Sequence, residues 1–126
     1  YKHEINNKII IYKGFEKNIL KILKNTSIFC LPSYREGMPK SVLEASAAGI
    51  PCIVSNAPGC KDSIINNQTG LLTKTMNYRD LAYKIIYLIK NPKLRNKLSQ
   101  NAKKFVKKDA SLENVTKKIF EIYDTK

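Results

Sequence analysis

Glu36 and Glu44 are the residues of this chain best suited to chemistry. Seven residues separate them in the run REGMPKSVLEASAAGIP. Acidic side chains are scarce, with ten Asp and Glu against 23 Lys and Arg, so two carboxylates around one helix start require a reason. A helix that follows a parallel strand directs its free N–H groups toward the carboxyl edge of the sheet, where they attract anions. The spacing therefore predicts an anion site framed by two carboxylates.

The elements that must position these glutamates follow from the apolar runs on either side. Pro39 suits the first helical position, because the N–H group that proline lacks has no partner there. Gly49 suits a left-handed helix end, and Pro51 cannot extend the helix. The pattern predicts a strand over Ile28–Leu31, a loop over 32–38, a helix over Pro39–Ala48 and a strand over Cys52–Ser55.

The rest of the chain continues the alternation of strands and helices. Asn77 with Asp80 three residues later resembles a capping box at a helix start. The expected elements are a strand over Ile9–Tyr12, a helix over Glu16–Lys24, a turn over Ala57–Gly59, a short helical stretch over Cys60–Ile65, a strand at Leu71–Leu72, and helices that begin at Asn77, Pro92 and Ser111. The apolar stripes of these three helices are Leu81, Ile85 and Leu88; Leu94, Leu98, Ala102 and Phe105; and Val115, Ile119, Ile122 and Tyr123. This order predicts an α/β fold with a Rossmann-like parallel sheet flanked by helices.

Length and composition limit the classes of protein. At 126 residues the chain holds one domain at most, and its first residue is Tyr1 rather than Met, so a fragment is expected. No run of 18 apolar residues occurs, so neither a membrane span nor a signal peptide is expected. The three cysteines form no C-x-x-C pair and are expected to be reduced thiols of a cytoplasmic protein. His3 is the sole histidine, so no metal site is expected.

The net charge of +13 leaves two readings open. The plain one is that Lys residues cover solvated helix faces. The other is attraction to an anionic membrane surface or to lipid phosphates, which would make the protein peripheral at the inner face of a membrane. No motif interleaves aromatic residues with this charge, so nucleic acid is not an expected partner.

The sequence resembles glycosyltransferase family 4, the retaining sugar-nucleotide transferases of the GT-B fold. The family motif, Glu-x7-Glu within PS-x-x-EG-x-P, matches Pro32-Ser33-Tyr34-Arg35-Glu36-Gly37-Met38-Pro39 and continues to Glu44. The likeness extends through AGIPCIVSNAPG and NNQTGLL and covers the chain from about Ile9. It implies that residues 1–126 form one partial domain, the C-terminal donor-nucleotide-binding domain. In the family this domain has six parallel strands, and the chain would begin at the third, without that strand's usual neighbours.

The resemblance also implies roles for individual residues. Glu36 would contact the donor sugar near the reacting centre, because a carboxylate accepts hydrogen bonds from two hydroxyl groups at once. Glu44 would hold the ribose hydroxyls, and Phe15 would meet the base. The remaining donor-binding residues would be Gly37, Met38 and Pro39, whose backbone passes close to the sugar; Ser41 and Val42, whose N–H groups face the diphosphate; and Lys40 beside the phosphate.

Plainer interpretations of the same residues stay open at this stage. Glu36 is also compatible with a solvated loop charge, and Glu44 with half of a surface ion pair. Gly59 is equally compatible with a simple turn, and Phe15 with a core position.

The implied parent protein transfers a sugar from a nucleotide donor, with UDP-sugar favoured, to an acceptor hydroxyl in glycolipid, capsule, lipopolysaccharide or glycan assembly. It would need no metal or other cofactor. The acceptor, a lipid-linked sugar or glycan, would bind a domain that this chain lacks, so the fragment is expected to be inactive alone. The alternatives are a non-catalytic module that binds a membrane or a partner, and another GT-B enzyme such as a sugar-nucleotide epimerase.

Overall fold

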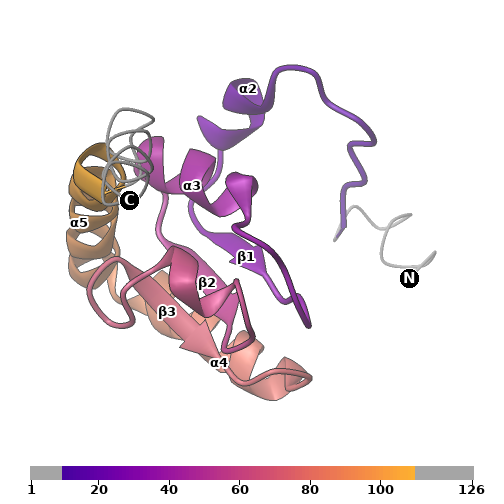
Figure 1. The fold of residues 1–126 in the computed structure, drawn as a ribbon, viewed down its shortest axis with the longest axis vertical. Coiled ribbons are helices and arrows are strands. Elements are labelled where there is room, and N and C mark those ends of the chain that lie inside the picture. Colours follow the sequence, from indigo (N-terminus) through magenta and orange to yellow (C-terminus); the bar gives the residue numbers. More distant parts are fainter. Residues whose placement is uncertain (1–9, 110–126) are drawn as a thin grey trace, which may run out of the picture.

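The computed structural model describes residues 10–109 of the chain (Figure 1). Within them three parallel strands form one sheet in the order β1-β2-β3. The strands are β1 (Phe29–Leu31), β2 (Cys52–Ser55) and β3 (Gly70–Thr73). In the register of the sheet Ile53 lies opposite Cys30 on one side and opposite Leu71 on the other. The expected parallel α/β architecture is therefore confirmed.

Helices cover both faces of this sheet. They are α2 (Ile19–Leu23), α3 (Lys40–Ala47), α4 (Tyr78–Lys90) and α5 (Pro92–Asp109), with a 3-10 turn η1 at Lys61–Ser63. One core cluster joins α2 and α3 to the sheet through Leu23, Val42 and Val54. The other joins α4 and α5 to the opposite face through Leu88, Leu98 and Ile53. Cys52 and Val54 of β2 belong to the first cluster and Ile53 to the second, because successive residues of a strand face opposite sides of the sheet, and all four residues of β2 are buried.

The β1–α3–β2 unit matches its expected boundaries to within one residue. Pro39 precedes the first helical residue instead of occupying it, and its carbonyl accepts hydrogen bonds from the Val42 and Leu43 N–H groups. Gly49 follows the helix with a left-handed backbone, at φ 79°. An α5 side chain, Ser99, donates its hydroxyl to the Gly49 carbonyl, which ties this helix end to the last described helix.

Two expectations at the amino-terminal end are wrong. Ile10–Tyr12 forms no strand, and the helix expected over Glu16–Lys24 is limited to Ile19–Leu23. The physical reason for the missing strand is that no described strand pairs with Ile10–Tyr12. Extended backbone becomes a strand only when its N–H and C=O groups are paired, and the segment before α2 runs away from the sheet as an exposed trace (Figure 1). Ile9 and the helix expected from Ser111, with its stripe, lie outside the described residues.

The start of α4 has one of the two hydrogen bonds of the expected capping box. Asn77 Oδ1 accepts a hydrogen bond from the Asp80 N–H at 2.9 Å, as expected. The Asp80 carboxylate does not return to the Asn77 N–H group. It accepts instead from the Lys74 N–H at 2.7 Å and the Thr73 hydroxyl at 3.0 Å, so this helix start is tied to the end of β3. In α5, Leu94, Leu98 and Ala102 belong to the core as expected, whereas Phe105 is half-buried.

Candidate functional site

The loops that follow the three strands meet at the carboxyl edge of the sheet. The Glu36 N–H group donates to the Pro58 carbonyl at 3.2 Å, which joins the loop after β1 to the loop after β2. The Asn56 N–H donates to the Thr73 carbonyl at 2.8 Å, and the Thr75 hydroxyl donates to the Asn56 carbonyl at 3.2 Å. These bonds make one connected surface from three separate stretches of chain.

Gly59 packs closely against the backbone of the loop that holds Glu36. Its backbone is left-handed, at φ 77°. A Cβ atom at this position would lie 2.0 Å from the Glu36 carbonyl oxygen and 2.2 Å from that of Gly37. Glycine is therefore required at residue 59 for contact with the loop as well as for the turn. The interpretation of Gly59 as a simple turn residue missed this contact, which no local pattern in the sequence announces.

Glu36, Gly37 and Met38 are all exposed in the loop. Gly37 differs from Gly59, because a Cβ atom built on it meets nothing within 4 Å and its backbone is not left-handed. The packing of the described chain therefore does not require glycine at residue 37. The open space leaves room for another molecule to approach this backbone.

The start of α3 lies directly after this loop. The Val42 N–H donates to the Pro39 carbonyl at 3.0 Å. Contrary to the expectation, it is therefore not free to bind an anion. The Lys40 and Ser41 N–H groups have no hydrogen-bond partner within residues 10–109. Together with the helix dipole, these two donors give the loop a partial positive charge. The Val42 side chain is fully buried and anchors the helix in the core.

Glu44 lies one turn further along α3, on its exposed face. The buried residues of the helix are Val42, Ala45 and Ser46. Neither Glu44 nor Glu36 forms an ion pair with any residue that the structure describes, so the alternative of Glu44 as half of a surface ion pair is wrong there. Both carboxylates are left with unused acceptor capacity.

The charge of Glu36 affects the pKa of the nearby Cys60 thiol. Burial raises the pKa of this thiol, and the Glu36 carboxylate raises it further by disfavouring a second negative charge nearby. Glu36 therefore projects its charge toward the loop after β2. The thiol itself is fully buried and stays protonated at neutral pH.

Phe15 is not brought to this surface. Its side chain is 91% exposed in the segment before α2, so the alternative of a core position is wrong. Its expected contact with a base stays a prediction. The remaining predicted residues, Glu36 to Val42 and Glu44, do fall together around the carboxyl edge and the start of α3.

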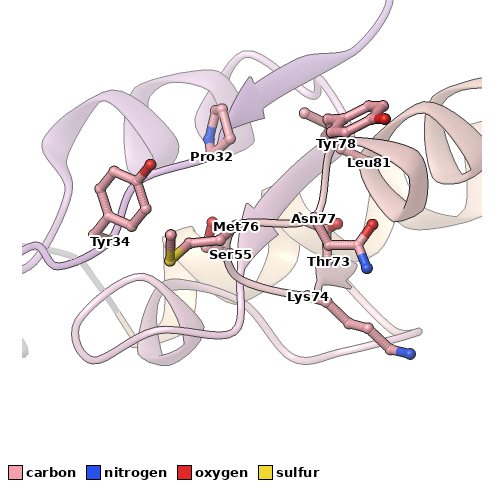
Figure 2. A pocket seen from close by; sticks show the side chains of 9 residues that line it. All are labelled: Pro32, Tyr34, Ser55, Thr73, Lys74, Met76, Asn77, Tyr78 and Leu81. Carbon is pink, nitrogen blue, oxygen red and sulfur yellow. The ribbon is translucent and has the colours of Figure 1, made fainter.

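A cavity of about 440 Å³ opens at the same edge, beside the start of α4 (Figure 2). None of the predicted site residues lines it. Its lining includes Tyr34, Ser55, Thr73, Met76, Asn77 and Tyr78. In the sequence Tyr34 reads as a loop residue, Ser55 as the end of a strand and Asn77 as a helix cap, and only the sheet topology brings them together.

Residues 10–109 contain no group of three or more His, Cys, Asp or Glu side chains placed to hold a metal ion. Across the same residues, no helix combines the length and the apolar character that a membrane crossing demands.

The structure is similar to solved glycosyltransferases. It superposes on HepE of Anabaena, solved in complex with UDP, with a TM-score of 0.90 at 18% identity, over 99% of this chain and 36% of that one. It also matches the C-terminal domain of LpcC, a group 1 family glycosyl transferase from Francisella tularensis, with a TM-score of 0.73 at 24% identity, over 88% of this chain and 63% of that domain. The shared fold is that of a GT-B C-terminal domain.

Sequence comparison reaches the same family. The chain is 45% identical over 98 residues to the N,N'-diacetylbacillosaminyl-diphospho-undecaprenol alpha-1,3-N-acetylgalactosaminyltransferase of Campylobacter jejuni. The match covers 78% of this chain but 26% of the relative, so the chain spans about a quarter of that enzyme's length. The family described as "Glycosyl transferases group 1" matches residues 1–105. The chain therefore belongs to the group 1 glycosyltransferases, a family of enzymes.

Proposed function

We propose that this domain binds the nucleotide-sugar donor of a retaining glycosyltransferase at the Glu36 loop and the start of α3. The observation that carries the proposal is the open backbone at Gly37 together with two N–H groups, at Lys40 and Ser41, and two carboxylates that have no hydrogen-bond or ion-pair partners among residues 10–109. A sugar nucleotide presents a diphosphate and two sets of hydroxyls. The helix start matches the diphosphate and the carboxylates match the hydroxyls.

Each residue then has a defined task. Glu44 accepts hydrogen bonds from the ribose hydroxyls, and Glu36 accepts from hydroxyls of the transferred sugar beside its reacting carbon. The backbone of Gly37, Met38 and Pro39 borders the sugar. Phe15 contacts the base, which requires the exposed segment before α2 to approach the sheet.

The departing nucleoside diphosphate is stabilised without a metal ion in this proposal. Oriented N–H groups act on charge that develops as the bond to the sugar breaks, and they need no reorganisation at that moment. The Lys40 and Ser41 N–H groups supply this stabilisation, and the exposed Lys40 side chain adds a positive charge.

The donor and acceptor classes are supported by the similar proteins. HepE was solved with UDP, which supports a UDP-sugar as donor. The name of the Campylobacter relative specifies a diphospho-undecaprenol-linked sugar, which supports a lipid-linked saccharide as acceptor. We place most of the acceptor-binding surface in a part of the enzyme that this chain does not cover. The chain alone should then give no labelled product with a UDP-sugar and a lipid-linked acceptor, and turnover by the chain alone would refute the division of tasks.

Titration of the 126-residue chain with UDP tests the donor site. We expect saturable binding that shifts the amide resonances of residues 36–44 in an ¹H–¹⁵N spectrum. Glu44→Ala should weaken UDP binding by about tenfold to a hundredfold, because a charged acceptor contributes about 1.5–3 kcal/mol. Glu44→Gln, which keeps a hydrogen-bond acceptor, should lose less. Equal affinity of the parent and the alanine variant would refute the ribose assignment.

A membrane contact is a second, compatible role, favoured by the charge of α5. This helix carries seven basic side chains within Pro92–Asp109. Sedimentation with vesicles that contain an anionic lipid should retain the chain at low salt and release it at high salt. Equal retention by neutral vesicles would exclude an electrostatic contact.

A further inference from the structure

The cavity beside the start of α4 is separate from the proposed donor residues. It lies where β1, β2 and β3 end, and its lining excludes Glu36 to Val42, Glu44 and Phe15. We refer to it as the Ser55 pocket, defined by Tyr34, Ser55, Thr73, Met76, Asn77 and Tyr78. The pocket combines a buried hydroxyl with an aromatic rim and little charge.

Ser55 places a buried hydroxyl in the lining of the pocket. It is the last residue of β2 and is 2% exposed, yet its hydroxyl has no hydrogen-bond partner among the described residues. Thr73, the last residue of β3, is equally buried, and its hydroxyl donates to Asp80 Oδ2 at 3.0 Å. Buried hydroxyls are nearly always paired, so an unpaired one that lines a cavity calls for a partner from outside the chain.

The rim of the pocket is aromatic and open. Tyr34 and Tyr78 are 67% and 75% exposed, and Met76 is 81% exposed. Met76 holds a left-handed backbone at φ 58°, which is uncommon for a residue with a side chain. Such conformations cost free energy and concentrate at ligand sites. In Figure 2 Ser55 lies between Tyr34 on one side and Thr73 and Asn77 on the other.

The placement of charge argues against an anionic ligand. Lys74 is the single charged residue among the described residues that line the pocket, and in Figure 2 its side chain extends away from Ser55 and Pro32. The nearby Arg79 guanidinium lies over the Tyr78 ring, 5.8 Å from its centre. The pocket therefore offers hydroxyl and amide groups between apolar surfaces, and no cation directed at a ligand.

We propose that the Ser55 pocket binds a neutral pyranose ring. A pyranose has hydroxyls at its edge and apolar C–H faces, which match the Ser55 hydroxyl at the floor and the tyrosine rings at the rim. The sugar can come from the acceptor saccharide or from the donor, and the choice of saccharide as ligand rests on the proposed function.

The test uses ¹H–¹⁵N spectra of the 126-residue chain with the methyl glycosides of glucose, galactose, N-acetylglucosamine and N-acetylgalactosamine. At least one should shift the amides of Ser55 and of residues 73–78 at millimolar concentration. Persistence of the shifts in saturating UDP assigns the pocket to the acceptor. Shifts of these amides by a UDP-sugar but not by UDP assign it to the donor sugar. The absence of any shift in the pocket, or shifts confined to residues 36–42, would overturn the proposal.

Matched variants separate binding from folding. Ser55→Ala should weaken glycoside binding by about three- to tenfold, the loss expected for one hydrogen bond. It should leave the melting temperature unchanged or raise it, because the removed hydroxyl has no partner in the described chain. Tyr78→Ala should weaken binding, whereas Tyr83→Ala, which removes another exposed tyrosine of α4 outside the pocket, should not. Equal losses in the two tyrosine variants would count against the pocket.

UDP provides an independent readout of the donor site. If UDP fails to bind while a glycoside shifts the pocket amides, the proposed donor function is wrong and the sugar pocket stands. If UDP binds at residues 36–44 and no glycoside reaches the pocket, the donor site stands and the sugar pocket is wrong.

Discussion

The two glutamates at the carboxyl edge differ in their backbone setting, and the difference predicts different kinetic roles. Glu36 lies in a loop whose N–H is bonded to the next loop, while Glu44 lies within α3. Contacts to the transferred sugar change as the transition state forms, whereas contacts to ribose do not.

In an active enzyme that contains this domain, Glu36→Ala should mainly lower kcat. Glu44→Ala should mainly raise the KM for the donor, because it removes binding that is equal in the ground and transition states. Steady-state kinetics over a range of donor concentrations distinguishes the two. A kcat for Glu36→Ala within about twofold of the parent, equivalent to less than about 0.5 kcal/mol on the barrier, would contradict the role assigned to Glu36.

Gly59 and Gly37 provide a second contrast between single residues. Gly59→Ala would place a Cβ atom 2.0 Å from the Glu36 carbonyl oxygen on a left-handed backbone, so both contact and conformation oppose it. We expect a loss of about 1–3 kcal/mol in the free energy of unfolding, measured by urea denaturation.

Gly37→Ala is the control, since its new methyl group meets nothing within 4 Å. Its free energy of unfolding should stay within about 0.5 kcal/mol of the parent. If Gly37 borders the donor sugar, this variant should weaken binding of a UDP-sugar more than binding of UDP. A stable Gly59→Ala variant would show that the loops can separate without cost.

At the level of elements, the link between β3 and α4 depends on one carboxylate. Hydrogen bonding from the Lys74 N–H lowers the pKa of Asp80, opposed by partial burial and assisted by the Thr73 hydroxyl and the Lys84 ammonium. The Lys84 Nζ lies 3.7 Å from Asp80 Oδ1. Because the folded pKa lies below the ordinary value of 3.8, the stabilisation is present above that value and is lost as pH falls through the folded pKa.

Thermal unfolding between pH 7 and pH 2 should show this dependence. The melting temperature of the parent should fall below about pH 4, where other carboxylates also contribute. Asp80→Asn should be less stable at pH 7 and should lose part of the acid dependence. A parallel shift of the whole curve, with an unchanged acid slope, would show that Asp80 does not titrate with folding.

The elements that sequence patterns predicted well are those set by local chemistry. The β1–α3–β2 unit was predicted to within one residue because Pro39, Gly49 and Pro51 act on the backbone next to them. The strand expected over Ile9–Tyr12 is absent from its described part, Ile10–Tyr12, because pairing depends on a neighbour that β-branched residues cannot specify.

Candidate site residues divide in the same way. The Glu36 loop and Glu44 were predicted because a single motif of the sequence contains them both. Ser55 and Tyr78 were not predicted as site residues, because in the sequence Ser55 reads as the end of a strand and Tyr78 as part of the first turn of a helix. Their shared pocket exists only because parallel strands bring three distant loops to one edge.

On the scale of the whole molecule, the thiols report on global packing, since Cys52 and Cys60 are buried and Cys30 is partly buried. Burial raises the pKa of Cys30 and of Cys52 to about 11, and the pKa of Cys60 is raised as well. All three are free cysteines. A thiol reacts as its thiolate, and the raised pKa values leave little thiolate near neutral pH.

Native protein at pH 8 should therefore react with a thiol reagent such as dithionitrobenzoate far more slowly than protein in denaturant. A raised folded pKa also means that stability is full below the ordinary value of 9.0 and declines as pH rises toward 11. Rapid reaction of all three thiols in the native protein would show that the two core clusters open readily.

The position of β1 at one side of the sheet has a further consequence. Among residues 10–109 no strand pairs with its outer edge, so this edge keeps hydrogen-bonding groups that another extended chain can complete. Any peptide that pairs with β1 in the folded state alone would raise the melting temperature by mass action. The domain is thus suited to complementation, in which the binding of a separate strand is detected as an increase in stability.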